Sequence, residues 1–263
     1  MRHLFLALLI VCPPALGLPK HDPVPGGIAL VPLTAASNVT FNGRLVMVNE
    51  SEGGYVAVVG IPLSQSPGSF HLDTPQGKVH FNVEAKQYEE QRLTIENKRK
   101  VNPYAQDMER ITRERAEMDA AFNTFRPVNR VQTGFDLPTE GIMSSSFGLR
   151  RILNNQPRNP HSGMDIAAPE GTPIYSPASG RVVASGDYFF NGNTVMVDHG
   201  QGLITMYCHM SSIEVEVGQT VEKRQLLGEV GKTGRVTGAH LHWSVSLNNA
   251  RVNPDLFLNK EDP

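Results

Sequence analysis

Four histidines and one aspartate in the second half of the 263-residue chain have residue types and spacing that could bind a metal ion. The first pattern is His161-Ser162-Gly163-Met164-Asp165, and the second is His240-Leu241-His242. The glycine inside the first pattern argues against a helix, and on an extended segment a spacing of four places two side chains on one face. The second pattern opens a run that alternates polar and apolar residues, which predicts a strand with both histidines on a groove.

The fourth histidine, His209, lies in the apolar run from Leu203 to Met210. Strand alternation would put four residues on one face: Ile204, Met206, Cys208 and Met210. The other face would then hold Thr205, Tyr207 and His209. We therefore expect His209 beside the groove and the Cys208 side chain on the opposite side, in a core. For Tyr207 two interpretations stay open, since its ring could line the groove or only pack beneath it.

Two histidines and one carboxylate with an open fourth position are typical of a catalytic zinc site, and no thiolate is needed. The open position would hold a water molecule whose pKa the zinc lowers towards neutrality. The leftover histidine of the pair and His209 would then serve as general base and transition-state stabiliser. The residues alone do not decide which of His240 and His242 binds the metal.

A single His-x-His pair is commonly structural, and a buried histidine is often satisfied by hydrogen bonds. Three separate segments that each offer a histidine to one groove favour a metal site instead. His199, at an expected turn between strands, is predicted to be structural. The remaining histidines of the exported chain have no matching partners, and no role is assigned to His21, His71 and His80.

The elements that must position these residues are mostly strands. From about residue 25 to 95, runs rich in β-branched residues alternate with glycine-containing turns, which predicts a small β-sandwich. The expected strands are Ile28–Val31, Arg44–Val48, Tyr55–Val59 and Val79–Val83. From about residue 134 to the end the pattern is again strands and turns, with expected strands at Gly180–Val183, Thr194–Val197, Leu203–His209 and Leu241–Leu247.

One helix is expected between these two parts. Residues 103–125 contain no glycine, and apolar residues recur at helical spacing: Met108, Ile111, Met118, Phe122 and Phe125. We interpret this segment as an amphipathic helix that joins two domains, with its charges on a solvated face. The predicted fold is therefore mainly β, with a signal peptide over 1–17, a β domain over 18–98, a helical linker over 99–130 and an antiparallel β-sheet domain over 131–263.

The first residues resemble a secretory signal. Arg2 precedes the apolar run Leu4–Cys12, which is too short to span a bilayer, and Ala15-Leu16-Gly17 offers a cleavage site. A lipoprotein anchored through Cys12 is the weaker alternative. With the signal removed, Cys208 is the only cysteine of the mature chain, so no internal disulfide is expected. The net charge of −2 gives no reason to expect nucleic acid as a partner, and no later segment suggests a transmembrane span.

The stretch from Pro157 to Val245 resembles the lysostaphin-like zinc peptidases, peptidase family M23. The resemblance rests on Pro157–Asp165, Pro169–Ile174, Tyr207–Met210, Gly231–Gly234 and Gly238–His242, in matching order and spacing. It implies that His161, Asp165 and His242 bind one Zn²⁺ and that His209 and His240 are catalytic. The segments before the peptidase region, including Tyr88–Ile95, are similar to an N-terminal β domain found in some of these enzymes.

The resemblance further implies a metalloendopeptidase that hydrolyses the peptide cross-links of bacterial peptidoglycan. The expected signal peptide, without a transmembrane span, predicts that this enzyme is secreted and periplasmic. One alternative is a non-catalytic protein of the same fold that binds the wall or activates other hydrolases. Another is a secreted peptidase that acts on protein. Which peptide bond is cleaved (D,D or L,D), the oligomeric state, any partner protein and whether the first domain inhibits or positions the enzyme stay open.

Overall fold

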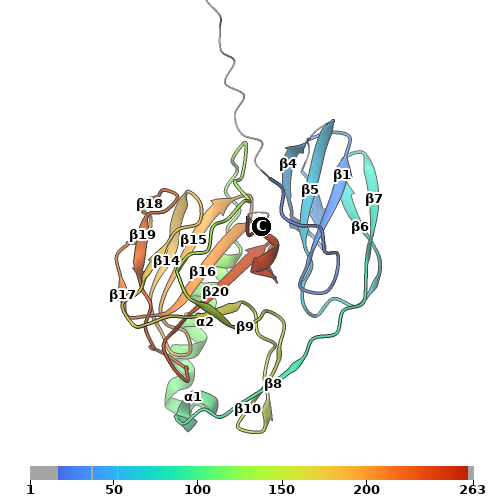
Figure 1. The fold of residues 1–263 in the computed structure, drawn as a ribbon. Helices are drawn as coiled ribbons and strands as arrows, with labels where there is room; N and C mark the ends of the chain where they lie inside the picture. Colours follow the sequence, from blue (N-terminus) through green and yellow to red (C-terminus); the bar gives the residue numbers. More distant parts are fainter. Residues whose placement is uncertain (1–16, 37, 52, 260–263) are drawn as a thin grey trace, which may run out of the picture.

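The computed structural model describes residues 17–36, 38–51 and 53–259, and the predicted mainly β fold is confirmed (Figure 1). The predicted signal peptide and Cys12 lie outside these residues, apart from Gly17. Within them, no helix is both long and apolar enough to cross a membrane.

The first part of the chain forms two small sheets that pack face to face. One sheet has the order β1-β5-β4 and the other the order β3-β2-β6-β7. The strands are β1 (Ile28–Leu33), β2 (Thr40–Phe41), β3 (Arg44–Leu45), β4 (Met47–Ser51), β5 (Gly54–Gly60), β6 (Gly68–Thr74) and β7 (Gly77–Val83). The predicted strand over Arg44–Val48 is divided at Val46 between the two sheets, which share a core of buried side chains that includes Phe41, Val59 and Leu72.

The sheet β1-β5-β4 is buried on both faces. Ala57 and Val59 of β5 point into the sandwich, whereas Val56 and Val58 belong to the core of the C-terminal part. Gly60 continues this contact, because its N–H donates to Asn248 Oδ1 at 2.7 Å and its carbonyl accepts from Asn248 Nδ2 at 2.9 Å. The sandwich is therefore docked on the rest of the molecule.

The C-terminal part is built on an eight-stranded sheet in the order β18-β14-β15-β16-β20-β12-β9, in which β21 also pairs with β20. All of these pairings are antiparallel. The strands are β9 (Ile142–Ser145), β12 (Met164–Ala167), β14 (Gly180–Tyr188), β15 (Gly192–Gly200), β16 (Leu203–Met210), β18 (Thr220–Val221), β20 (His240–Leu247) and β21 (Ala250–Val252).

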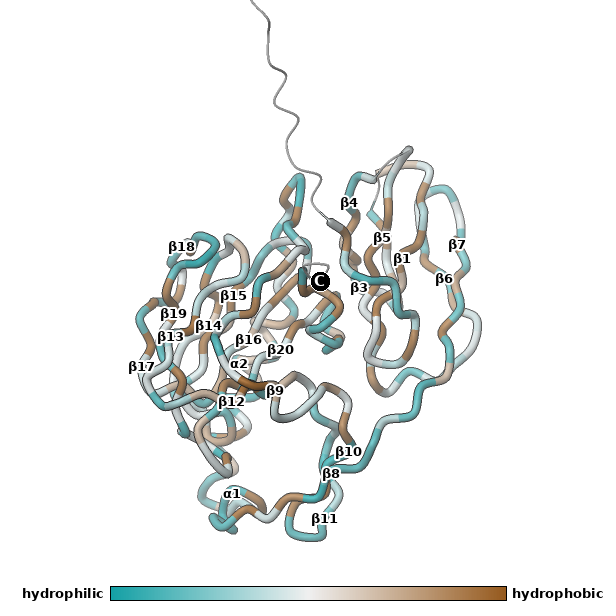
Figure 2. Tube along the Cα trace, in the orientation of Figure 1, coloured by the Kyte–Doolittle hydropathy of each residue, from teal (hydrophilic) through white to brown (hydrophobic). Residues whose placement is uncertain are grey.

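Two smaller sheets complete this part. One joins β13 (Pro173–Tyr175), β19 (Leu226–Glu229) and β17 (Ser212–Ile213). The other joins β11 (Gln156–Pro157), β10 (Arg150–Leu153) and β8 (Glu90–Leu93), with β8 parallel to β10. The polar connection that leads from β7 to β8 is visible as a hydrophilic stretch in Figure 2. A short 3₁₀ helix, η2 (Pro254–Leu256), follows β21.

The expected amphipathic helix is α2 (Met108–Phe122), preceded by the single turn α1 (Lys98–Val101) and the 3₁₀ turn η1 (Ala105–Asp107). Ala121 and Phe122 pack on the face of the large sheet that carries Ala184, Met196, Ile204, Met206 and Cys208. The expectation that its charges are all solvated is wrong for Glu114, which is buried and accepts a hydrogen bond from the Phe189 N–H at 2.7 Å. Met108, expected on the apolar face, is instead 49% exposed.

Candidate metal centre

Asp165 and His242 lie directly opposite each other on the neighbouring antiparallel strands β12 and β20. Residues paired in this way project to the same side of a sheet, so the strand register alone brings the two side chains together. His242 Nδ1 lies 2.8 Å from Asp165 Oδ1. His161 enters from the loop just before β12, and its Nε2 lies 2.9 Å from Asp165 Oδ1 and 3.0 Å from His242 Nδ1. All three residues are buried.

The hydrogen bonds on the outer nitrogens determine which nitrogen of each ring faces the centre. His161 Nδ1 lies 2.7 Å from the Ser146 carbonyl oxygen, which can only accept, so Nδ1 carries the proton and Nε2 offers its lone pair. His242 Nε2 lies 2.9 Å from Ser244 Oγ, which can accept from it and so leave the Nδ1 lone pair facing inward. Two imidazole lone pairs and a carboxylate oxygen then converge on one point.

This convergence fits a metal ion. His161, Asp165 and His242 form a group whose ligand atoms lie within 4.8 Å of one another. Ligands about 2.0–2.2 Å from a tetrahedral zinc ion lie roughly 3.3 Å apart, close to the spacing of these three atoms. Nitrogen and carboxylate donors suit zinc, and the nearby thiol of Cys208 is buried in the core under α2, where it offers no ligand.

The protonation states are those that a metal centre needs. Burial lowers the pKa of His242 to about 4, so its ring is neutral at neutral pH. Burial alone would raise the pKa of the Asp165 carboxyl, but its contacts with His161 and His242 outweigh burial and hold that pKa well below its usual range. Arg151 Nη2 donates to Asp165 Oδ2 at 2.9 Å and so orients the carboxylate from its outer side.

Two further histidines lie beside this group. The ring centroids of His209 and His240 are 4.9 Å apart, and His240 Nε2 lies 3.9 Å from Asp165 Oδ1. His209 Nδ1 donates to the Thr233 carbonyl at 2.8 Å, and His240 Nδ1 donates to the Gly238 carbonyl at 2.9 Å. In the neutral form of each ring, Nε2 is then the unprotonated nitrogen. Burial and the neighbouring histidines also hold the pKa of His209 well below its usual value.

The backbone at His209 has a left-handed conformation, with φ of 66°, which is uncommon outside glycine. The register between β15 and β16 shifts between the pairs Val195–Tyr207 and Asn193–Met210, so β16 contains a bulge at this point. The bulge corrects the predicted alternation. Ile204, Met206 and Cys208 lie in the core under α2 as expected, but Met210 turns to the other core, which also holds Tyr207.

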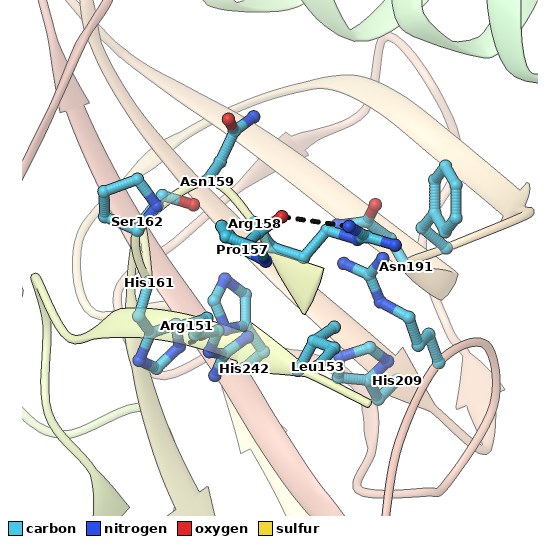
Figure 3. A pocket seen from close by; sticks show the side chains of 13 residues that line it. Arg151, Leu153, Pro157, Arg158, Asn159, His161, Ser162, Asn191, His209 and His242 are labelled. Carbon is cyan, nitrogen blue, oxygen red and sulfur yellow. Dashed lines mark hydrogen bonds between the residues drawn. The ribbon is translucent and has the colours of Figure 1, made fainter. Parts of the chain in front are cut away.

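A cavity of about 660 Å³ adjoins the candidate centre (Figure 3). His161, His209 and His242 lie in its wall, together with residues from β10, β11 and the loops around them. The other lining residues are Arg151, Leu153, Pro157, Arg158, Asn159, Pro160, Ser162, Phe190, Asn191 and Arg235. The arginines were not singled out from the sequence, although Arg158 lies in the segment Pro157–Asp165 on which the family resemblance rests.

The structure brings together all five residues selected from the sequence. Tyr207 is not in the cavity wall: it is fully buried, and its hydroxyl donates to Thr205 Oγ1 at 2.9 Å, so it packs beneath the site. His199 is structural as predicted, because its Nδ1 contacts the Ser179 carbonyl at 2.9 Å and its Nε2 contacts Thr205 Oγ1 at 2.8 Å. Burial lowers the pKa of His199 to about 4.

Comparisons with known proteins agree with this arrangement. Residues 159–254 match the model of peptidase family M23, and residues 21–86 match that of the peptidase family M23 N-terminal domain. A crystal structure of an M23 family member from Pseudomonas aeruginosa is 44% identical, covers 90% of this chain and 95% of its own, and superimposes with a TM-score of 0.77.

Curated relatives match less than half of the chain. The chain is 42% identical over 112 residues to the peptidoglycan DD-endopeptidase ShyA of Vibrio cholerae. The matched stretch covers 42% of this chain and 26% of that protein. The chain is also 39% identical over 112 residues to the DD-carboxypeptidase/endopeptidase Mpg of Neisseria meningitidis. This match covers 43% of this chain and 26% of that protein. The chain thus spans about a quarter of the length of these relatives.

Fold and site together define a two-part, mainly β protein with one candidate metal centre on its large sheet. The chain belongs to peptidase family M23, because the Pseudomonas aeruginosa family member matches it over nearly its whole length.

Proposed function

We propose that this protein is a secreted zinc metalloendopeptidase that hydrolyses the peptide cross-links of bacterial peptidoglycan. The observation that carries the proposal is the convergence of the His161, Asp165 and His242 donor atoms beside the rings of His209 and His240. The peptidoglycan DD-endopeptidase activity for which ShyA is named supports peptidoglycan as the substrate, since ShyA is 42% identical to this chain over 112 residues.

In this proposal His161, Asp165 and His242 hold one Zn²⁺. When bound, zinc would lower the pKa of a water molecule and polarise the scissile carbonyl. Arg151 keeps the Asp165 carboxylate oriented, and the Ser146 carbonyl fixes the tautomer of His161.

His209 and His240 are the proposed catalytic residues. Because each Nδ1–H is tied to a backbone carbonyl, each Nε2 is oriented and able to accept the proton of an attacking water. The protonated ring can then donate a hydrogen bond to the oxygen that becomes negative in the transition state. The arrangement leaves open which of the two rings takes the first proton.

The organisation of the chain is part of the proposal. Residues 1–17 would direct export to the periplasm, where peptidoglycan lies, and residues 18–98, 99–130 and 131–263 would form the β domain, the helical linker and the peptidase domain. The complete set of five site residues favours an enzyme over a non-catalytic protein that binds the wall or activates other hydrolases.

The test combines digestion with metal analysis. Purified protein is incubated with peptidoglycan sacculi and the released fragments are identified by mass spectrometry, with a chelated and zinc-restored sample in parallel. We expect cutting by the wild type and by the control His80→Ala, an exposed histidine of the sandwich. His209→Ala and His240→Ala should lose activity but retain zinc, and His242→Ala should lose both. Undiminished cutting by His242→Ala would refute the assignment.

A further inference from the structure

Three guanidinium groups from three separate segments line the cavity beside the candidate metal centre. Arg151 lies on β10, Arg158 directly follows β11, and Arg235 lies in the loop between β19 and β20. Figure 3 shows the Arg158 side chain extending across this cavity, with its hydrogen bond to the Pro157 carbonyl. The neighbouring strands β10 and β11 and the distant loop before β20 together place a concentrated positive charge next to the candidate metal centre.

This charge is only partly neutralised. Arg151 is paired with Asp165, but Arg158 donates only to neutral oxygens, those of Val101, Asn102, Gln156 and Pro157. Arg235 donates to the Lys100 carbonyl at 3.4 Å and lies over the Phe190 ring, 4.7 Å from its centroid. Within the described residues, neither Arg158 nor Arg235 has a carboxylate within ion-pair distance.

The environment of Arg235 adds to the imbalance. Burial, together with the positive charges of Arg151 and Arg158, lowers the pKa of Arg235 to about 10, so the group is still charged at neutral pH. Bringing a charged group into such a site is unfavourable unless an opposite charge joins it. A planar guanidinium matches a carboxylate with two parallel hydrogen bonds, which a point charge cannot do.

We propose that this cavity is a carboxylate-binding subsite, in which Arg158 and Arg235 bind a free carboxylate on the peptide residue next to the scissile bond. The inference rests on the proposed function and specifies its substrate: a peptide that carries a negative charge beside the bond to be cut. Such a carboxylate has two sources, the C-terminus of a linear peptide and the side chain of a residue within a cross-link.

Binding tests the subsite without turnover. Calorimetric titration of the full chain compares N-acetyl-D-alanyl-D-alanine with its C-terminal amide. Because hydrogen bonds between charged groups are stronger than those between neutral groups, we expect at least about tenfold tighter binding of the acid. Arg158→Gln and Arg235→Gln should each reduce this preference, and Arg235→Lys should restore it only in part. Arg115→Gln, an exposed arginine of α2, is the charge-matched control.

Equal affinity for acid and amide in the wild type would overturn the subsite, as would a preference that survives in both glutamine variants. Arg235 is the safer of the two substitutions, since its side chain makes one long hydrogen bond and a ring contact. Thermal unfolding of each variant establishes that the chain is folded before it is titrated.

Cleavage then separates the two sources. KM is measured for a linear stem peptide and for a cross-linked stem dimer, each with the relevant carboxylate free or amidated. The substrate whose KM rises on amidation identifies the source of the carboxylate. If amidation changes KM for neither substrate, the proposal is overturned. A chain that cuts nothing but keeps the arginine-dependent preference refutes the proposed function and leaves the subsite standing. A chain that cuts the amidated and free forms equally refutes the subsite and leaves the proposed function standing.

Discussion

At the scale of single residues, the candidate site depends on backbone atoms that hold the histidine rings. His161, His209 and His240 each give one N–H to a carbonyl oxygen, those of Ser146, Thr233 and Gly238. These bonds select the tautomer and the ring orientation before any ligand arrives, which is the preorganisation that catalysis by fixed groups requires.

Gly163 illustrates how closely the backbone approaches these rings. A Cβ added at this position would lie 2.4 Å from the Trp243 carbonyl oxygen, 2.6 Å from Ser244 Oγ and 2.8 Å from His242 Cε1. We therefore expect Gly163→Ala to displace His242 and to weaken zinc binding by roughly 10–100-fold, the range found when groups that orient a ligand are disturbed. Competitive zinc titration measures the effect.

Gly238→Ala is the matched control for this substitution. Gly238 also lies near the site, but no atom lies within 4 Å of the Cβ it would gain, and its carbonyl bond to His240 is retained. Equal zinc affinity in the two alanine variants would show that the contact with His242 does not matter.

At the scale of elements, the connection before α2 is held by one carboxylate. Asp107 accepts hydrogen bonds from Arg99 of α1 and from the Tyr104 N–H at 2.9 Å, and so joins α1 to the start of α2. Its hydrogen bond with Arg99 lowers the pKa of Asp107 to about 2. An aspartate in an unfolded chain has a pKa of about 3.9.

The pH dependence follows from this difference. The folded state binds its proton less tightly than the unfolded state, so Asp107 contributes stability above about pH 4 that is lost as the pH falls towards 2. We expect Asp107→Asn to destabilise the protein at pH 7 and the gap to the wild type to narrow steadily below pH 4. Urea unfolding at several pH values measures it, and a gap that stays constant with pH would contradict the expectation.

Several elements were predictable because their patterns are local. The alternation after His240 predicted β20, and helical spacing predicted α2. The bulge at His209 was not predictable, because it depends on how β16 pairs with β15. The side of the sheet on which Met210 lies depends on the same bulge. Spacing was enough to select His161, Asp165 and the pair of His240 and His242, whereas the choice of His242 as the ligand came from the family resemblance. The arginines of the cavity meet only after β10, β11 and the loop before β20 are placed.

At the scale of the whole molecule, the sandwich and the large sheet share one core. The apolar run in β5 does not alternate with polar residues, which is the sequence signal of a strand buried on both faces, and Val56 and Val58 do pack on the C-terminal part. The expected picture of two domains joined by a helix is therefore incomplete, since α2 lies against the sheet and the domains touch directly.

Asn248 is the polar contact at the centre of this interface. Both bonds of its amide go to the backbone of Gly60, and their loss would leave a buried N–H and a buried carbonyl without partners. We expect Asn248→Ala to lower the free energy of unfolding by roughly 2–4 kcal/mol. Urea unfolding followed by tryptophan fluorescence measures the change.

The neighbouring Asn249→Ala serves as the control, because Asn249 has a similar left-handed backbone but bonds only within the C-terminal part, to Asn123 and Arg251. If the two variants are destabilised equally, the contact with Gly60 adds nothing beyond backbone strain.

The shared core also has a consequence for the order in which the chain acquires its structure during synthesis. Strands β1 to β7 can pair as soon as residue 83 has emerged, but Ile28, Met47, Val56 and Val58 are covered only after β20 and β21 have been made. An early intermediate therefore exposes an apolar sheet face to solvent while more than half of the protein is still being translated. Exposed apolar surface of this kind promotes aggregation and is bound by chaperones.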